Sequence, residues 1–308
     1  MRRPEPADLM LLATVTLWGL NFTVTKYVLS HGFQPLAYAS LRFGMAASIL
    51  AGLAYAREQS FSMRRRDLVL LAGAALIGIC LNQLTFVYAI KLTTATTVAL
   101  LFGTLPVIAG LFAFALGIER VGLRFWLAAV LALGGAALVA VGSGGGLSKH
   151  FWGVLLALGA TVTWAFYSVA AAPVLGRYSP LRVSALAFVA GTIPLVAIGS
   201  HQLAAQDYGF SASIWLLYAF AVIGPLVVAN LLWFGAIARV GPSRAAVFAN
   251  LQPFIAAIFA LLLLSEPITR LQVVGGLAIA AAIVLSRSRS SERAPLAADA
   301  RVPGAVRR

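Results

Sequence analysis

Arg42 has the clearest capacity for chemistry in this sequence. It follows Pro35 by seven residues inside a long apolar segment, which is about 10 Å of helix at 1.5 Å per residue. A guanidinium can bind carboxylates and phosphates through parallel hydrogen bonds, and burying it at the centre of a membrane costs roughly 2.5–3.5 kcal/mol on insertion scales. We therefore predict that Arg42 recognises an anionic group, with extension of its side chain to the outer interface as the alternative.

Uncharged polar and aromatic residues in other apolar segments are further candidates. Four recur at i, i+4, i+7 and i+11, which places them on one helix face: Thr14, Trp18, Asn21 and Thr25. Polar groups inside membranes are frequently functional, although each could equally join two helices, and Asn82 has the same two interpretations. The predicted substrate-binding residues are Trp18, Asn21, Arg42, Gln83, Tyr88, Trp164, Tyr167, Asn230, Asn250 and Gln252.

The acidic, histidine and cysteine residues are placed unfavourably for catalysis. All nine Asp and Glu residues lie at segment ends, in connections or in the tails, the three His residues lie in or beside connections, and Cys80 is the single cysteine. Acid/base and metal sites need clusters of such groups, so we predict no enzymatic activity, no metal and no cofactor. Glu119 and Glu266, at segment ends, are expected to make interfacial ion pairs or helix-end contacts.

The elements that must position these residues are membrane-spanning helices. Of the 308 residues, 61% are hydrophobic and 10% charged, against about 45–50% and about 25% in soluble domains. The apolar runs are long and rich in Ala and Leu, unlike the short alternating segments of a membrane barrel. Helices need about 20 residues to cross, which predicts an all-α protein with ten transmembrane helices, at approximately 9–29, 36–56, 68–90, 94–117, 125–141, 151–172, 181–198, 213–237, 245–264 and 271–285.

The basic residues indicate how the segments cross. The net charge is +14, but Lys and Arg lie between apolar segments and in the tail, which argues against nucleic acid as a partner. With a cytoplasmic N-terminus, the inside segments hold eighteen Lys and Arg residues and the outside segments four. Cytoplasmic loops are the ones enriched in positive charge, so both termini are predicted to be cytoplasmic.

The chain also contains an internal repeat. A glycine-rich stretch at 142–150 resembles a linker, and Pro106 and Glu119 recur 147 residues later as Pro253 and Glu266. Both prolines are expected to kink or open their helices. Each half would hold five spans and, because five is odd, the halves would be inverted relative to each other, an architecture that puts a substrate site at the repeat interface.

One segment is suited to close helix packing. Ala128, Ala132, Ala136 and Ala140 recur every four residues, which gives a smooth strip that another helix can approach. Whether that helix belongs to the same chain stays open at this point.

Taken together, these residues resemble a known family, the EamA type of the drug/metabolite transporter superfamily. The segments that carry the resemblance are Trp18–Phe22, Ala89–Ala95, Pro106 and Glu119 in the first half, and Trp164, Ala236–Ile237, Pro253 and Glu266 in the second. The resemblance covers roughly residues 8–286. It implies a first five-helix repeat at 8–142 and a second at 151–286; residues 287–308 are predicted from composition to be a disordered cytoplasmic tail.

The resemblance implies a secondary transporter that works by alternating access in the cell membrane and exports amino acids or related metabolites. Its partners would be a small-molecule substrate and the lipid bilayer, with the oligomeric state undefined. A channel and a non-transporting scaffold or scramblase are the alternatives. Because no carboxylate lies centrally in a span, a neutral, zwitterionic or anionic substrate is favoured over a lipophilic cation.

Overall fold

The computed structural model describes residues 5–118, 120–143 and 149–287. All regular structure in these residues is helical, and none is a strand. In chain order the elements are α1 (Pro6–Ser30), α2 (Pro35–Glu58), α3 (Arg65–Ala75), η1 (Leu76–Leu81), α4 (Asn82–Leu92), α5 (Ala95–Phe102), α6 (Leu105–Ala115), α7 (Leu123–Gly142), α8 (Lys149–Leu175), α9 (Pro180–Ala205), α10 (Ala212–Val222), η2 (Ile223–Val228), α11 (Ala229–Ala249), α12 (Gln252–Leu264) and α13 (Arg270–Arg287).

Singly or as consecutive elements joined end to end, these helices form runs that are long and apolar enough to cross a membrane. Nine such spans occur in the described part of the chain, and Arg270–Ser286 is a shorter apolar helix where the tenth span was predicted. One boundary differs, because α11 continues through residues 238–244, where we predicted a connection. Glu119, most of the predicted linker and the predicted tail from residue 288 lie outside the described residues.

The spans are interrupted at matching places in the two halves. A π-helical segment occurs at Leu76–Leu81 and again at Ile223–Val228, 147 residues later. Pro106 and Pro253 each occupy the second position of a new helix, α6 and α12, after a break at residues 103–104 and 250–251. Backbone N–H groups in the first turn of a helix have no helical acceptor. Proline, which has no N–H, therefore loses no hydrogen bond there and is favoured at this position. The prolines therefore follow an interruption in each span.

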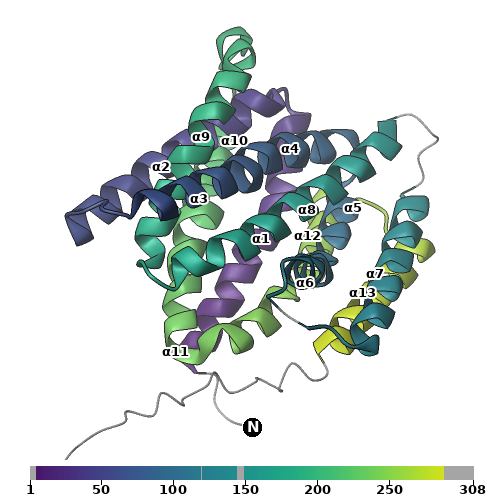
Figure 1. Cartoon of the computed structure of the whole chain (residues 1–308). Helices are drawn as coiled ribbons and strands as arrows, with labels where there is room; N and C mark the ends of the chain where they lie inside the picture. The colour runs from purple at the N-terminus through teal and green to yellow at the C-terminus, as the bar shows by residue number, and fades with distance from the viewer. Residues whose placement is uncertain (1–4, 119, 144–148, 288–308) are drawn as a thin grey trace, which may run out of the picture.

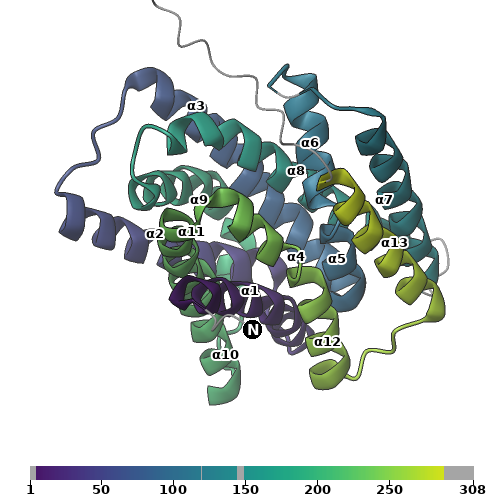
Figure 2. The same cartoon turned by 90° about the horizontal axis from the view of Figure 1, so that it is seen from below.

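Two pairs of helices organise the bundle. α2 packs along α9, and α7 packs along α13 (Figures 1 and 2). Each end of the α2–α9 pair is tied: the Gln34 N–H, before α2, donates to Oε1 of Gln206, after α9, at 2.6 Å. At the other end Ser179, before α9, donates to the carboxylate of Glu58, the last residue of α2. The two helices are therefore antiparallel and joined at both ends.

The α7–α13 pair settles which helix approaches the predicted alanine strip. Ala128 and Ala132 are buried, and the facing helix is α13 of the same chain. The backbones come close at two glycines, because a Cβ on Gly275 would lie 2.5 Å from the carbonyl oxygen of Gly135. Small residues permit this approach, as at many membrane helix interfaces.

Candidate functional site

The side chain of Arg42 is the centre of a buried polar cluster. Only 1% of this residue is exposed. Its Nη1 donates to Oδ1 of Asn21 at 2.9 Å, to Oη of Tyr38 at 3.3 Å and to Oγ1 of Thr25 at 3.4 Å. Its Nη2 donates to Oε1 of Gln83 at 3.1 Å. The guanidinium is therefore enclosed by side chains of the helix bundle.

Helical spacing explains how these residues meet. Asn21 and Thr25 are four residues apart on α1, and Tyr38 and Arg42 are four residues apart on α2, so each pair shares one face. Gln83 belongs to the first turn of α4, directly after the π-helical segment. Such segments reorient the side chains that follow and are frequent at functional sites. Three helices thus converge on one guanidinium.

All the acceptors around Arg42 are neutral. In the described part of the chain, no carboxylate lies within ion-pair distance of it, and its Nε has no hydrogen-bond partner. The rings of Tyr38 and Phe43 lie 5.1 and 5.3 Å from its Cζ, a distance at which cation–π attraction contributes. These groups solvate the charge but do not neutralise it.

The bonded network extends beyond Gln83. Its Nε2 donates to Oδ1 of Asn82 at 3.0 Å. Nδ2 of Asn82 donates in turn to the carbonyl of Ala160 at 2.7 Å and to Oγ1 of Thr163 at 3.2 Å. Arg42 is therefore connected to α8, in the second half of the chain.

Several predicted site residues have partners elsewhere. Nε1 of Trp18 donates to the carbonyl of Pro225, within η2, at 3.0 Å. The rings of Trp164 and Tyr167 lie 5.5 Å apart, and Tyr167 packs so closely on Gly78 that a Cβ there would lie 2.1 Å from it. Trp18 and Tyr167 thus both contact π-helical segments, η2 and η1 respectively.

The remaining predicted residues are spread along the bundle. The Tyr88 hydroxyl accepts from Nε2 of Gln202 at 2.9 Å, on α9. Nδ2 of Asn230 donates to the Leu226 carbonyl, and this residue lines a mainly apolar cavity of about 220 Å³ between α2, α9 and α11. Asn250 and Gln252 lie at the break between α11 and α12. Of the ten predicted residues, the structure joins Asn21, Arg42 and Gln83 by hydrogen bonds, and Trp164 and Tyr167 by a ring contact.

The charged site has no counterpart in the second half. At the offsets that align the two halves, Arg42 corresponds to Ala187 and Gln83 to Asn230. Ala187 is fully buried. The cluster is therefore asymmetric in charge, although the helices around it recur in sequence.

Sequence analysis did not identify Tyr38 as a member of the cluster. The four-residue spacing of Tyr38 and Arg42 could have indicated it, because residues four apart lie on the same helix face. It also did not predict that Nζ of Lys26 donates to the carbonyls of Ile90 and Thr93, at 2.9 and 2.6 Å, where α4 ends. Cations are favourable at helix C-termini, but the sequence does not reveal which terminus lies nearby.

Glu266 makes the helix-end contact that was one of its two predicted roles. Its carboxylate accepts from the backbone N–H groups of Ala95 and Thr96, at 3.0 Å each, and from the hydroxyl of Thr96. These groups form the first turn of α5, where N–H groups lack helical partners and a negative charge is favourable. Glu266 therefore stabilises a helix terminus in the first half of the chain.

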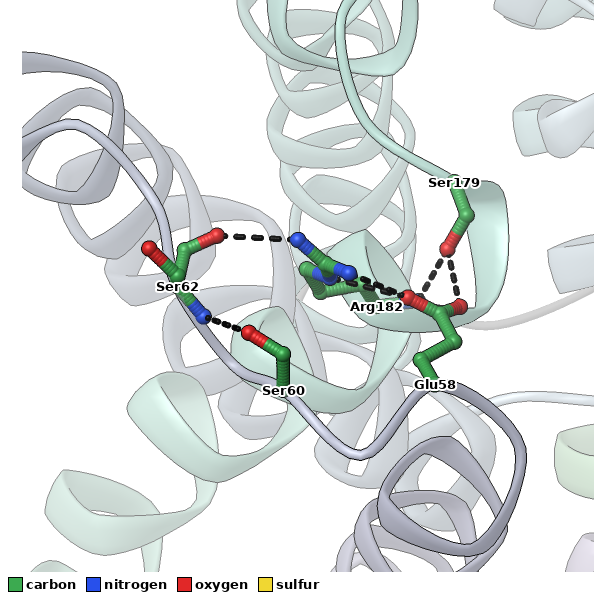
Figure 3. A network of polar contacts seen from close by, with 5 residues as sticks. All are labelled: Glu58, Ser60, Ser62, Ser179 and Arg182. Atoms are coloured by element: carbon green, nitrogen blue, oxygen red, sulfur yellow. Dashed lines mark hydrogen bonds and ion pairs between the residues drawn. The ribbon is translucent and has the colours of Figure 1, made fainter.

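Two ion pairs join the α2–α3 connection to the region between α8 and α9. Arg182 donates to Glu58 at 2.8 Å through Nε, and both contact Ser179 (Figure 3). Nη1 of Arg177 donates to Oδ1 of Asp67 at 2.7 Å. Both carboxylates thus have their own arginines, and neither is a counter-ion for Arg42. No group of three or more metal-binding side chains occurs in the residues described.

Comparison with known proteins agrees with this architecture. The sequence model of the EamA-like transporter family matches the chain twice, at residues 5–141 and 151–288. A "Probable terminal-alkyne amino-acid exporter" of Streptantibioticus cattleyicolor is 28% identical over 289 residues, which are 92% of this chain and 94% of that protein. An "Uncharacterized inner membrane transporter YedA" of Escherichia coli is 26% identical over 270 residues, 85% and 84% of the two chains.

A solved structure shares the fold. A protein crystal structure superposes with a TM-score of 0.62 at 19% identity, and the match covers 91% of this chain and 96% of the other. The apolar helices and the transporter relatives identify a multi-pass membrane protein. Since the family match covers nearly the whole chain, this protein belongs to the EamA-like transporter family.

Proposed function

We propose that this protein is a secondary transporter that exports amino acids or related carboxylate-bearing metabolites across the cell membrane by alternating access. The observation that carries the proposal is Arg42, a buried arginine surrounded only by neutral acceptors in the described residues. A buried charge without a counter-ion is costly, and an intramembrane ionisable residue is by default a candidate functional site. A substrate carboxylate would supply the missing negative charge.

The geometry around the guanidinium would allow a substrate carboxylate to replace its neutral acceptors. Asn21 and Gln83 accept from separate nitrogens, and each amide can also donate a hydrogen bond. A carboxylate that took over Nη1 and Nη2 would form two parallel hydrogen bonds in which donor and acceptor are both charged, whereas the present acceptors are neutral. The displaced amides could then donate to the substrate. The same site offers no carboxylate to attract a lipophilic cation.

The repeated features support inverted repeats and alternating access. Thr14 contacts the carbonyl of Ala229 at 3.3 Å, and Asn82 contacts the carbonyl of Ala160 at 2.7 Å. At the offsets that align the halves, these two contacts are equivalent. With the paired π-helical segments and the two family matches, they favour two homologous five-helix units. Transporters of this architecture expose a central site alternately to each side.

Export and the amino-acid class are supported by one relative, which is named as a probable terminal-alkyne amino-acid exporter and aligns over nearly the full length of both chains. The excess of Lys and Arg in alternate connections supports cytoplasmic termini. Of the described charged residues, Arg42 is the one whose burial and partners fit recognition of the carboxylate that all amino acids share.

Transport in proteoliposomes tests the proposal. Vesicles containing the purified protein should release a mixture of ¹⁴C-labelled L-amino acids in a saturable manner. An excess of the unlabelled mixture should inhibit release, and the corresponding amino-acid amides should not. Arg42→Gln should abolish release at unchanged protein abundance. Arg177→Gln is the matched control, because Arg177 is an exposed arginine with its own carboxylate partner.

Other outcomes favour other functions. Unsaturable release with single-channel conductance would identify a channel. Lipid transfer between leaflets without amino-acid release would identify a scramblase. Full activity of Arg42→Gln would refute the role of Arg42. Metabolite profiles of cells lacking or overproducing the protein would then establish the direction and the particular substrate.

A further inference from the structure

The hydrogen bonds that leave Arg42 run in one direction. Nη2 of Arg42 donates to Oε1 of Gln83, Nε2 of Gln83 donates to Oδ1 of Asn82, and Nδ2 of Asn82 donates to the Ala160 carbonyl. The distances are 3.1, 3.0 and 2.7 Å. The chain thus passes from α2 through α4 to the main chain of α8.

The direction is dictated by the two ends of the chain. A guanidinium can only donate, and a main-chain carbonyl can only accept. Gln83 must therefore present its oxygen to Arg42 and its nitrogen to Asn82, and Asn82 must present its oxygen to Gln83 and its nitrogen to Ala160. Rotating either amide by half a turn would place two donors or two acceptors against each other. Each link holds the next in a single orientation.

Asn82 connects Gln83 to α8, in the second half of the molecule. It is buried, with 4% exposed, and it is the first residue of α4 after η1. At the repeat-equivalent positions, the Thr14 hydroxyl of α1 contacts the carbonyl of Ala229, on α11, and the carbonyl of Met10, on its own helix. Both the Thr14–Ala229 and the Asn82–Ala160 contacts join the two halves of the chain. Of the two, the contact made by Asn82 is the one that continues through Gln83 to Arg42.

We propose that Asn82 is a positioning residue for the carboxylate site. It holds the Gln83 oxygen toward Arg42 and so fixes the guanidinium relative to α8. The inference rests on the proposed function, because the group that Asn82 positions is the arginine assigned to the substrate carboxylate. Asn82 itself has its donor and acceptor atoms engaged, and its role is exerted through Gln83.

Transport kinetics provide the first test. In the release assay with labelled L-amino acids, Asn82→Ala should raise the half-saturating concentration about tenfold and leave the maximal rate within about twofold. Asn82→Asp keeps the shape of the side chain and its acceptor for Gln83 but cannot donate to Ala160, so it should give the same rise. Thr161→Val is the matched control, because the buried Thr161 hydroxyl bonds only within α8.

Combining substitutions distinguishes positioning from general loss of packing. If Asn82 acts through Gln83, Asn82→Ala should add little to the effect of Gln83→Ala on the half-saturating concentration. If the two substitutions acted independently, their fold-increases in the half-saturating concentration would multiply in the double variant, and this result would overturn the proposal. So would a loss of maximal rate in Asn82→Ala and Asn82→Asp with an unchanged half-saturating concentration.

A spectroscopic test does not depend on transport. In protein labelled with ¹⁵N-arginine, the Nη signals of Arg42, assigned with Arg42→Lys, should show hindered rotation because both Nη atoms are bonded. Asn82→Ala and Asn82→Asp should accelerate this rotation, and Thr161→Val should not. Unchanged rotation in both Asn82 variants would overturn the positioning role. If rotation accelerates in both Asn82 variants but the wild-type protein releases no amino acid, the proposed function is refuted and the positioning role stands.

Discussion

The Oδ1 atom of Asn21 lies 2.9 Å from Nη1 of Arg42, so a neutral amide occupies the place where a carboxylate would form an ion pair. The two residues are 21 positions apart, on α1 and α2. An aspartate would have nearly the same shape as Asn21 and would add the missing charge. This relationship gives the sharpest prediction for the site.

Asn21→Asp should stabilise the protein and inhibit transport. Leaving a buried charge without its partner typically costs about 3–5 kcal/mol, and an aspartate at position 21 would supply that partner, so the midpoint of thermal unfolding should rise in detergent. Amino-acid release should fall at least tenfold, because the internal carboxylate competes with the substrate. Asn230→Asp is the control and should destabilise, since Asn230 donates to the Leu226 carbonyl. Normal transport by Asn21→Asp would contradict the proposed anion site.

Two adjacent glycines should differ in their tolerance of a methyl group. A Cβ at Gly135 would lie 2.7 Å from the carbonyl oxygen of Gly275, whereas a Cβ at Gly134 would meet nothing within 4 Å. Overpacking typically costs about 1–3 kcal/mol, so Gly135→Ala should lower the unfolding midpoint and Gly134→Ala should leave it unchanged or raise it. Equal effects of the two substitutions would show that the α7–α13 contact is looser than described.

Glu266 should contribute to stability through the first turn of α5. In Glu266→Gln the amide NH₂ replaces one carboxylate oxygen, so one of the donors from Ala95 and Thr96 loses its acceptor. Loss of an N-terminal capping interaction costs about 0.5–2 kcal/mol, and the unfolding midpoint should fall. Asp207→Asn, in an exposed turn, should have a smaller effect. A Glu266→Gln variant as stable as the wild type would refute the capping role.

The orientation of the chain can be tested with single cysteines. The one native cysteine, Cys80, is buried, so Cys80→Ala provides a background for labelling. We expect a cysteine at position 301 to react with an impermeant maleimide only after the cells are opened, and a cysteine at position 150 to react in intact cells. Reaction of both from the same side would overturn the predicted arrangement of ten spans.

The sequence alone predicted the helical membrane fold, the approximate limits of nine spans and of a shorter tenth apolar helix, and the repeat offset. It also predicted a candidate site that includes Arg42, Asn21 and Gln83. These properties are local. Hydropathy over about 20 residues predicts a span, and helical periodicity predicts a shared face. The recurrence of Pro106 as Pro253 likewise needs only comparison of two stretches of the same chain.

The tertiary structure decided which faces meet. Periodicity places Arg42 on a face of α2 but does not say that Asn21 and Gln83 lie opposite it. It also gave no preference between burial of the Arg42 guanidinium among helices and its extension to the membrane interface. The same holds for Glu266, whose partner Ala95 is 171 residues away, and for the alanine strip of α7, which could have faced another chain. Such contacts depend on how helices from distant parts of the sequence pack together, and this is set by the fit of many side chains at once rather than by any single segment.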